Sequence, residues 1–216
     1  MGRGGKSLRT PALEHKDWTQ EQWNSVVFSD ESKFDVSVGD QRGRVVRNKH
    51  EGFHESCLKR TVKFPAGQMI WGCMSNKGVA PLCFIDGTVN ANKYQNILQE
   101  HLLPSMQQFN CSENMIFQQD GASCHTAKSS IKWLNDHKIK VMEWPSSSPD
   151  LNPIENLWGQ IKKKLRCVRP RTKQILKENL SELWSQINAE DCQNLYNSMH
   201  KRMQGVIAAK GDVTRY

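Results

Sequence analysis

The sequence predicts a mixed α/β domain with a central sheet, flanked by helices and followed by a C-terminal helical extension. Residues 26–38 begin with an apolar run and then place apolar side chains at every second position, as a strand does. Residues 69–74 and 114–120 have the length and composition of further strands. Strand-like and helix-like segments then alternate, and the chain from Asn152 onward has helical spacing, an order typical of mixed α/β folds.

Turn signals and helical spacing predict the remaining elements. A short helix is expected over residues 17–23, with Asp17 or Thr19 as its cap. Short strands are expected at residues 44–47, 79–85 and 139–142, and helices at residues 90–103, 126–137, 153–167, 172–187 and 190–209. The helix over residues 90–103 is expected to stop before Pro104, because proline disfavours helical backbone in the residue before it.

Charge and length limit the class of protein. A chain of 216 residues suits one domain of ordinary size. Its net charge of +8 is compatible with a polyanionic partner such as nucleic acid, but charge alone is explained at least as well by a basic protein without such a partner. The sequence contains no run of eighteen apolar residues, so no membrane span is predicted. The basic N-terminus has no apolar stretch after it, so it is not expected to be a secretory signal.

The cysteines indicate a reducing compartment. There are seven, an odd and widely spaced set without a Cys-x-x-Cys pair, which argues against a disulfide framework and a structural zinc site. Cys124 and His125 are adjacent, but no second pair at ligand spacing completes a zinc site.

Three acidic residues occupy positions that could carry chemistry. Asp30 lies within the first strand, Asp120 closes a later strand, and Glu155 opens a helix. Two strand positions and one helix start can converge at one sheet edge. Magnesium prefers hard oxygen ligands, and a pair of such ions ~3.5–4 Å apart can activate the attacking oxygen and stabilise the leaving oxygen in phosphoryl chemistry. The three acids are therefore the candidate catalytic and metal-binding residues.

Each acid also has an explanation that needs no catalysis. Asp30 could be a turn or surface acid, as could its neighbour Glu31. Asp120 followed by Gly121 is a common pair at the turn after a strand. Glu155 has the strongest alternative, since Asn152 suits the N-cap, Pro153 the first helical position and Glu155 the third, which together make a capping-box pattern. The hypothesis depends on the three acids together with the residues that flank them.

The flanking residues resemble the catalytic signatures of the Tc/mariner superfamily of transposases. They are FSDESKF around Asp30, QQDGASCHT around Asp120, and WPSSSPDLNPIENLW around Glu155. Thirty-four residues separate Asp120 from Glu155, which is similar to the spacing of the Tc-type branch. The resemblance extends from about residue 14 to residue 216. Ser123 departs from it, because the family usually has proline between the second aspartate and the histidine.

The resemblance implies a ribonuclease H-like fold and a DDE transposase with nuclease activity. Members cleave phosphodiesters at the ends of a transposable element and join the freed 3′ ends to a TA target. It implies that Asp30, Asp120 and Glu155 hold two Mg²⁺ ions, for which Mn²⁺ can substitute. The implied partners are transposon-end and target DNA and a second copy of the chain in the DNA complex. Neither a membrane nor a small-molecule substrate is expected, and the implied location is the nucleus.

The resemblance also divides the chain. It implies a catalytic domain over residues 17–216, with a clamp-like basic loop at residues 39–67, C-terminal helices at residues 172–216, and a poorly ordered or unrelated lead-in at residues 1–16. Full members carry two helix-turn-helix units before the catalytic domain, and nothing before Trp18 matches them. The chain alone is therefore not expected to recognise transposon ends.

Further residues are candidates for supporting roles. His125 and Asn152 are candidate auxiliary residues by their places in the motifs. Basic residues that could contact DNA are Lys59, Arg60, Lys63, Lys162, Lys163, Lys164 and Arg166. The last four could instead form a solvated helix face or part of a nuclear import signal.

Two other functions remain open at this stage. One is a catalytically silent DNA-binding or dimerising protein derived from a transposase. The other is a different ribonuclease H-like enzyme, such as a structure-specific nuclease. Metal-dependent nicking separates the first from a transposase, and strand transfer into a TA target separates the second.

Overall fold

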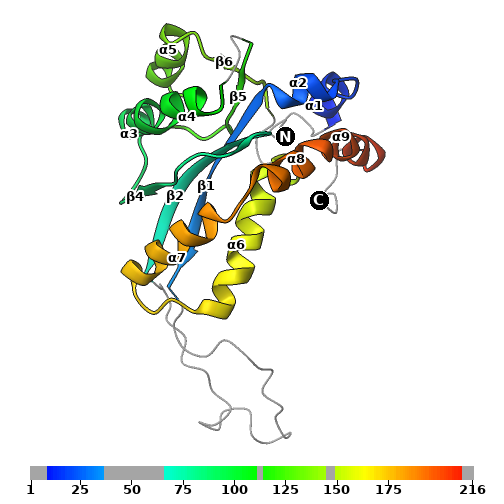
Figure 1. Cartoon of the computed structure of the whole chain (residues 1–216). Helices are drawn as coiled ribbons and strands as arrows, with labels where there is room; N and C mark the ends of the chain where they lie inside the picture. Colours follow the sequence, from blue (N-terminus) through cyan, green and yellow to red (C-terminus); the bar gives the residue numbers. More distant parts are fainter. Residues whose placement is uncertain (1–8, 37–65, 111–113, 145–148, 211–216) are drawn as a thin grey trace, which may run out of the picture.

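A mixed sheet forms the centre of the computed structural model, which describes residues 9–36, 66–110, 114–144 and 149–210 (Figure 1). The strands are β1 (Val26–Asp35), β2 (Gly67–Ser75), β3 (Gly78–Val79), β4 (Cys83–Ile85), β5 (Ile116–Gln118) and β6 (Lys140–Val141). Their order is β3-β2-β1-β5-β6, and β4 also pairs with β2. β1 is antiparallel to β2 and parallel to β5, and β5 is parallel to β6. The predicted mixed sheet is confirmed.

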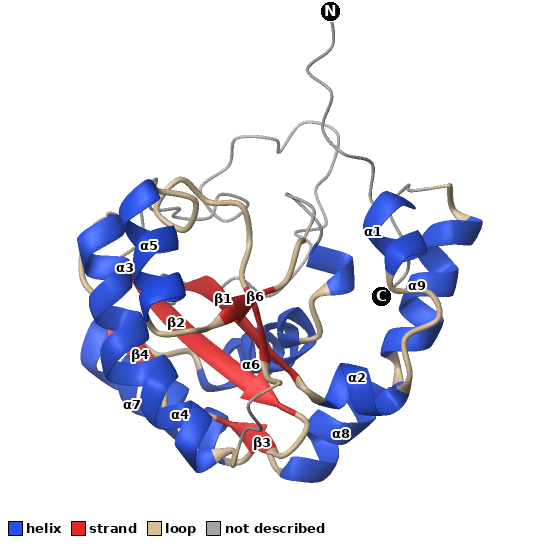
Figure 2. Ribbon diagram, turned by 90° about the horizontal axis from the view of Figure 1, so that it is seen from above, coloured by secondary structure: helices blue, strands red, loops and turns tan. Residues whose placement is uncertain are grey.

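Helices cover both faces of the sheet (Figure 2). They are α1 (Arg9–Glu14), α2 (Gln20–Asn24), α3 (Ala91–Ile97), η2 (Leu98–Leu102), α4 (Leu103–Gln108), α5 (Lys128–Asp136), η3 (Pro149–Leu151), α6 (Ile154–Val168), α7 (Lys173–Ser185), α8 (Ala189–Asn197) and α9 (Met199–Ala208). Apolar side chains of α3, α4 and α5 form a core with one face of the sheet, and those of α6 to α9 form a core with the other. No helix in the described ranges has the length and apolar character needed to cross a membrane.

Alternation along β1 sends its side chains to two different cores. Val26 and Phe28 belong to the core that contains α6, whereas Val27 belongs to the core that contains α5. Successive side chains of a strand point to opposite faces of the sheet. Asp30 and Glu31 follow the same rule further along β1, and each bonds a side chain on its own face. Two neighbouring acids of one strand are thus directed to opposite helical layers.

A glycine lets α6 pack closely against the sheet. Gly72 lies opposite Asp30 in the β1–β2 register, and a Cβ atom at position 72 would stand 2.8 Å from the ring of Trp158. Trp158 is fully buried and stacks on Trp184, with ring centroids 4.7 Å apart. The ring therefore has little room to move away, and this contact sets the distance between α6 and the sheet.

A buried tyrosine attaches the C-terminal helices to the sheet. The hydroxyl group of Tyr196 in α8 donates a hydrogen bond to the carbonyl oxygen of Val26 at 2.7 Å, and it lies 3.1 Å from the carbonyl oxygen of Met74. Its ring packs edge-on against Phe28, with centroids 5.5 Å apart. These contacts join α8 to the beginning of β1 and the end of β2.

The N-terminal segment differs in part from the prediction. The expectation of a poorly ordered lead-in over residues 1–16 is wrong for Arg9–Glu14, which form α1. α1 packs against α9, and its Ala12 is fully buried. A helix this short is stabilised by tertiary packing rather than by its own propensity, so local sequence could not reveal it. Thr19, one of the two expected caps, forms a capping box with Gln22 at the start of α2.

The predicted end of the helix over residues 90–103 is wrong, because the helical path continues through Pro104. The π-helical segment η2 joins α3 to α4, and the amide of Leu103 donates to the carbonyl of Leu98. In a regular α-helix a proline ring clashes with the carbonyl four residues before it. A π-turn widens the helix locally, which accommodates the proline without ending the helix.

The predicted helix over residues 190–209 is divided into α8 and α9 at Ser198. The Ser198 hydroxyl donates to the carbonyl of Leu195 at 2.6 Å and accepts from Nε of Arg202 at 2.8 Å. A serine side chain that bonds nearby backbone competes with helical hydrogen bonds, which explains the break. The predicted strand at residues 44–47 and most of the segment 39–67 lie outside the described residues.

Two glycine-to-alanine substitutions should have opposite effects on stability. Gly72→Ala should lower the free energy of unfolding by about 1–3 kcal/mol, because the added methyl group overlaps the Trp158 ring. Gly159→Ala in α6 has open space around the new methyl group and should raise the free energy of unfolding by ~0.5–1 kcal/mol through helix propensity. Urea unfolding of both variants checks this, and equal effects would contradict the packing described.

Candidate active site

Asp30 is a largely buried acid at the centre of the sheet. The indole Nε1 of Trp158 donates a hydrogen bond to its carboxylate at 3.1 Å. Burial and then the nearby negative charges of Glu155, Glu31 and Asp120 together raise the pKa of Asp30 to about 8, against a backbone hydrogen bond that lowers it. The negative charges of the other acids in the site therefore act electrostatically on Asp30.

The parallel pairing of β1 and β5 places Asp120 near Asp30. Phe28 lies opposite Gln118 in this register, so Asp30 and Asp120 each follow the last paired position by two residues. The Asp120 carboxylate is half-exposed and accepts a hydrogen bond from the amide of Ala122 at 2.9 Å. A hydrogen bond from His125 and this amide lower the pKa of Asp120, while partial burial opposes them. Asp120 is thus held as a carboxylate at the end of β5.

His125 connects two of the acids. Its Nδ1 lies 2.6 Å from the Asp120 carboxylate and its Nε2 lies 3.2 Å from that of Glu31, while only 3% of the side chain is exposed. Burial lowers the pKa of His125, but the hydrogen bonds to Asp120 and Glu31 outweigh it and raise the pKa to about 10. The imidazolium is therefore charged at neutral pH and offsets part of the repulsion between the carboxylates.

A tyrosine supports the imidazole ring of His125. The ring of Tyr94 from α3 lies against it, with centroids 4.0 Å apart. The Tyr94 hydroxyl donates to Oε1 of Gln119 at 2.6 Å, so the residue before Asp120 is held as well. Burial raises the pKa of Tyr94 well above its usual range, which keeps the hydroxyl a hydrogen-bond donor.

Glu155 lies in the first turn of α6, and no capping box forms there. The structure gives Pro153 as the N-cap residue, without a side-chain cap bond. Asn152 is buried instead, where its Oδ1 accepts from the amide of Ile154 at 3.3 Å and its Nδ2 donates to the carbonyl of Ser29 at 3.1 Å. The capping-box alternative for Glu155 is wrong, because the Asn152 side chain accepts from the amide of Ile154 and not from that of Glu155, whose amide donates to the Asn152 carbonyl.

The carboxylates offer the oxygen ligands that a magnesium or manganese ion prefers. In the described part of the chain, no group of three or more His, Cys, Asp or Glu side chains forms a complete arrangement that could hold a metal ion. The acids nevertheless surround Asp30 closely enough to raise its pKa. A divalent cation would relieve this repulsion, so the donor set fits such an ion chemically.

The candidate DNA-binding lysines differ in what the structure shows of them. Lys162, Lys163, Lys164 and Arg166 are exposed on α6. The ammonium group of Lys162 lies 5.4 Å from the centre of the Phe34 ring, on the side of α6 that faces β1. Lys59, Arg60 and Lys63 lie outside the described residues.

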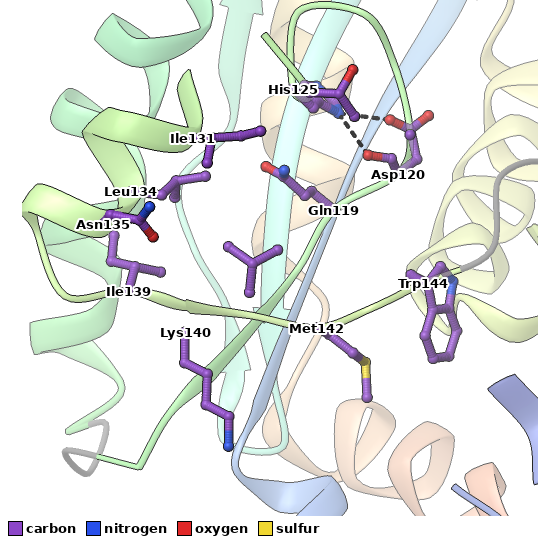
Figure 3. A pocket seen from close by; sticks show the side chains of 13 residues that line it. Gln119, Asp120, His125, Ile131, Leu134, Asn135, Ile139, Lys140, Met142 and Trp144 are labelled. Carbon is purple, nitrogen blue, oxygen red and sulfur yellow. Dashed lines mark hydrogen bonds and ion pairs between the residues drawn. The ribbon is translucent and has the colours of Figure 1, made fainter. Parts of the chain in front are cut away.

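A pocket of about 490 Å³ opens beside Asp120 and His125 (Figure 3). Leu134 of α5 and Ile139 and Met142 next to β6 line its apolar wall. The half-exposed carboxylate of Asp120 thus borders a hollow in which part of a substrate could lie.

Comparison with known proteins identifies the family. The sequence model of the family described as DDE superfamily endonuclease matches residues 25–177. The chain belongs to this family. It is 34% identical over 206 residues to the transposable element Tcb1 transposase of Caenorhabditis briggsae and 32% identical to the transposable element Tc1 transposase of Caenorhabditis elegans, covering 95% of this chain and 75% of each relative. It is therefore a transposase catalytic domain of the Tc1/mariner type, an enzyme that cleaves and transfers nucleic acid.

Solved structures show the same fold. The catalytic domain of Mos1 mariner transposase superposes with a TM-score of 0.75 at 17% identity, covering all of this chain and 98% of that one. The Mos1 mariner paired end complex with Mn gives a TM-score of 0.82 at 19% identity, covering all of this chain and 67% of that one. The predicted ribonuclease H-like fold and DDE family are confirmed, and a nuclease outside the transposases is no longer an alternative.

Several residues of this site could not be identified from local sequence. Glu31 was visible only as the neighbour of Asp30, although the period of a strand directs it to the opposite face. Tyr94 and Trp158 looked like ordinary core residues, and their polar atoms find partners only in the folded chain. No local pattern marks such partners.

Replacing Asp30 by asparagine should stabilise the metal-free domain at high pH. The unfolded carboxyl group loses its proton near 3.8, whereas the folded group keeps it until about pH 8. The folded state therefore binds more protons between these values, and its stability falls as pH rises through this window. Asp30→Asn removes this loss, so the melting temperature of the variant should exceed that of the wild type at pH 8 and approach it at pH 4. For a domain of this size, each kcal/mol of stability corresponds to ~2–4 °C in melting temperature.

A matched substitution controls for the loss of a carboxylate. Asp86 is fully exposed, and its hydrogen bond and ion pair with Lys173 lower its pKa, so Asp86→Asn should give no gain at pH 8. Calorimetry in a chelating buffer at several pH values measures both variants. A melting difference for Asp30→Asn that does not change with pH would disprove the assignment.

Proposed function

We propose that Asp30, Asp120 and Glu155 are the catalytic metal ligands of this transposase domain and that they hold two Mg²⁺ ions, with Mn²⁺ as a substitute. The observation that carries the proposal is the gathering of acids around Asp30, whose pKa is raised by its burial and then by the negative charges of Glu155, Glu31 and Asp120. The paired end complex of Mos1 mariner transposase has been solved with Mn and with Mg, which supports divalent metal use in this fold.

Each ligand is prepared by its own surroundings. Trp158 orients the Asp30 carboxylate, and the Ala122 amide and His125 orient that of Asp120. Bound divalent ions supply activation of the attacking water or 3′ hydroxyl and stabilisation of the leaving oxygen in an in-line displacement. His125 and Asn152 act as supporting residues, since one bridges Asp120 to Glu31 and the other joins the start of α6 to β1.

The proposed substrate is DNA, both at transposon ends and at a TA target. The net charge of +8 supports a polyanionic substrate. The exposed lysines of α6 follow Glu155 on the same helix and can approach phosphates next to the acids, and Lys59, Arg60 and Lys63 are proposed contacts in the basic segment. The Mos1 relatives were solved as paired-end and strand transfer complexes, which supports a homodimer on DNA.

The proposed division of the chain is a catalytic domain over residues 17–216, with the clamp-like segment 39–67 and the helical segment 172–216 as parts of it. α1 adds residues 9–14 to the packed structure through its contact with α9. The proposed site of action is the nucleus, where the DNA substrate is located.

Nicking of supercoiled plasmid tests the metal ligands. The chain should nick the plasmid with Mg²⁺ or Mn²⁺ and not in a chelator. Glu155→Gln and Asp30→Asn should each reduce the rate on the order of 100-fold or more, because a metal ligand provides several kcal/mol of transition-state stabilisation. Asp86→Asn, whose carboxylate pairs with Lys173 instead, should leave the rate unchanged.

Folding must be checked in the same samples, since Glu155 lies in the first turn of α6. Circular dichroism spectra that match the wild type would show that any loss concerns chemistry. Equal nicking rates in wild type and Glu155→Gln would refute the ligand assignment. DNA binding without nicking by the wild type would favour a catalytically silent, transposase-derived protein, and transfer of 3′ ends into TA-containing plasmid would support the complete reaction.

A further inference from the structure

Arg202 of α9 is a buried cation that bonds the segment carrying Glu155. Only 3% of its surface is exposed. Its Nη1 donates to the carbonyl oxygen of Asp150 at 2.9 Å, its Nη2 to Oδ1 of Asn156 at 2.5 Å, and its Nε to the hydroxyl of Ser198 at 2.8 Å. Each nitrogen of the guanidinium group therefore has a partner, and two of the three partners lie on one short stretch of chain.

Such an arrangement does more than fill the core. Burying a charged group is unfavourable unless it is well paired, and α9 otherwise packs through apolar side chains such as Met199, Met203 and Val206. The planar fork of an arginine holds several acceptors in fixed relative positions, which a lysine cannot do. Here the fork fixes the carbonyl of Asp150, before the turn into α6, relative to the side chain of Asn156, after it.

The same segment is held from the opposite side by Asn152. Its Nδ2 donates to the carbonyl of Ser29, the residue before Asp30. The chain from Asp150 to Asn156 is thus fastened to β1 by one side chain and to α9 by another, with Glu155 in between. α9 lies beyond residues 25–177, which the family's sequence model matches.

We propose that Arg202 is a positioning residue that holds Glu155 in place relative to Asp30 for metal binding. The proposal rests on the assignment of Glu155 as a metal ligand. It gives the C-terminal helices a part in the active site, because α9 braces the beginning of α6 through Arg202 without contacting the substrate.

The test measures metal binding to the 216-residue chain by thermal stabilisation with Mn²⁺. Arg202→Lys keeps the charge but cannot reach all three acceptors. The Mn²⁺ concentration for half-maximal stabilisation should rise about 10-fold in this variant, the low end of what loss of a supporting partner does at metal sites. Asn156→Ala removes one acceptor while Arg202 stays, so it should raise this concentration in the same direction.

Tyr196→Phe provides the matched control for a merely structural effect. Tyr196 also fastens a C-terminal helix to the rest of the domain, but it bonds the carbonyls of Val26 and Met74 and does not contact the Asp150–Asn156 segment through these bonds. It should lower the melting temperature without changing the Mn²⁺ midpoint. Hydrogen exchange in the metal-free chain should become faster at residues 154–157 in Arg202→Lys, but not in Tyr196→Phe.

The outcomes separate the two levels of the hypothesis. Wild-type binding of Mn²⁺ that Glu155→Gln abolishes, together with an unchanged midpoint in Arg202→Lys and Asn156→Ala, would overturn the role of Arg202 alone. A wild type that Mn²⁺ does not stabilise, or a Glu155→Gln midpoint equal to that of the wild type, would overturn both the ligand assignment and the role of Arg202. A higher Mn²⁺ midpoint in Arg202→Lys and Asn156→Ala, with an unchanged midpoint in Tyr196→Phe, would establish the positioning role of Arg202.

Discussion

Repulsion between carboxylates is the constraint on which the arrangement of this domain depends. The parallel register of β1 and β5 brings Asp30 and Asp120 to the same level of the sheet, and the start of α6 adds Glu155. Burial raises the pKa of Asp30, and the negative charges of Glu155, Glu31 and Asp120 add to this effect. Without a cation Asp30 keeps its proton until about pH 8, so the domain gathers these acids without all of them being charged at neutral pH.

Different side chains support the acids on the two faces of β1. On the side of α6, Trp158 donates to Asp30, and Gly72 leaves the space that its ring needs. On the side of α5, the imidazolium of His125 lies between Glu31 and Asp120, and the ring of Tyr94 packs against it at a tilt. Since successive residues of a strand point to opposite faces, one acid of the pair 30–31 can serve metal binding while the other holds a cation.

Much of the architecture followed from local patterns. The period of two in β1, the apolar segments of β2 and β5 and the helical spacing of α6 and α7 were all readable because they repeat within a few residues. The errors arose where a distant contact or a local rearrangement prevailed. α1 is stabilised by α9, the π-helical turn accommodates Pro104, and the Ser198 side chain divides α8 from α9.

The sequence by itself determined the family and the fold and singled out the three acids as candidate ligands, since their spacing and flanking residues lie in short continuous segments. The tertiary structure alone decided which groups support those acids. His125 bonds Glu31, which lies 94 positions away in the sequence, and Trp158 bonds Asp30, which lies 128 positions away. Asn152 was expected only as a helix cap, whereas in the folded chain its Oδ1 accepts from the amide of Ile154 and its Nδ2 also reaches the carbonyl of Ser29. Such choices depend on which distant groups the fold brings within hydrogen-bonding distance, and no local pattern specifies that.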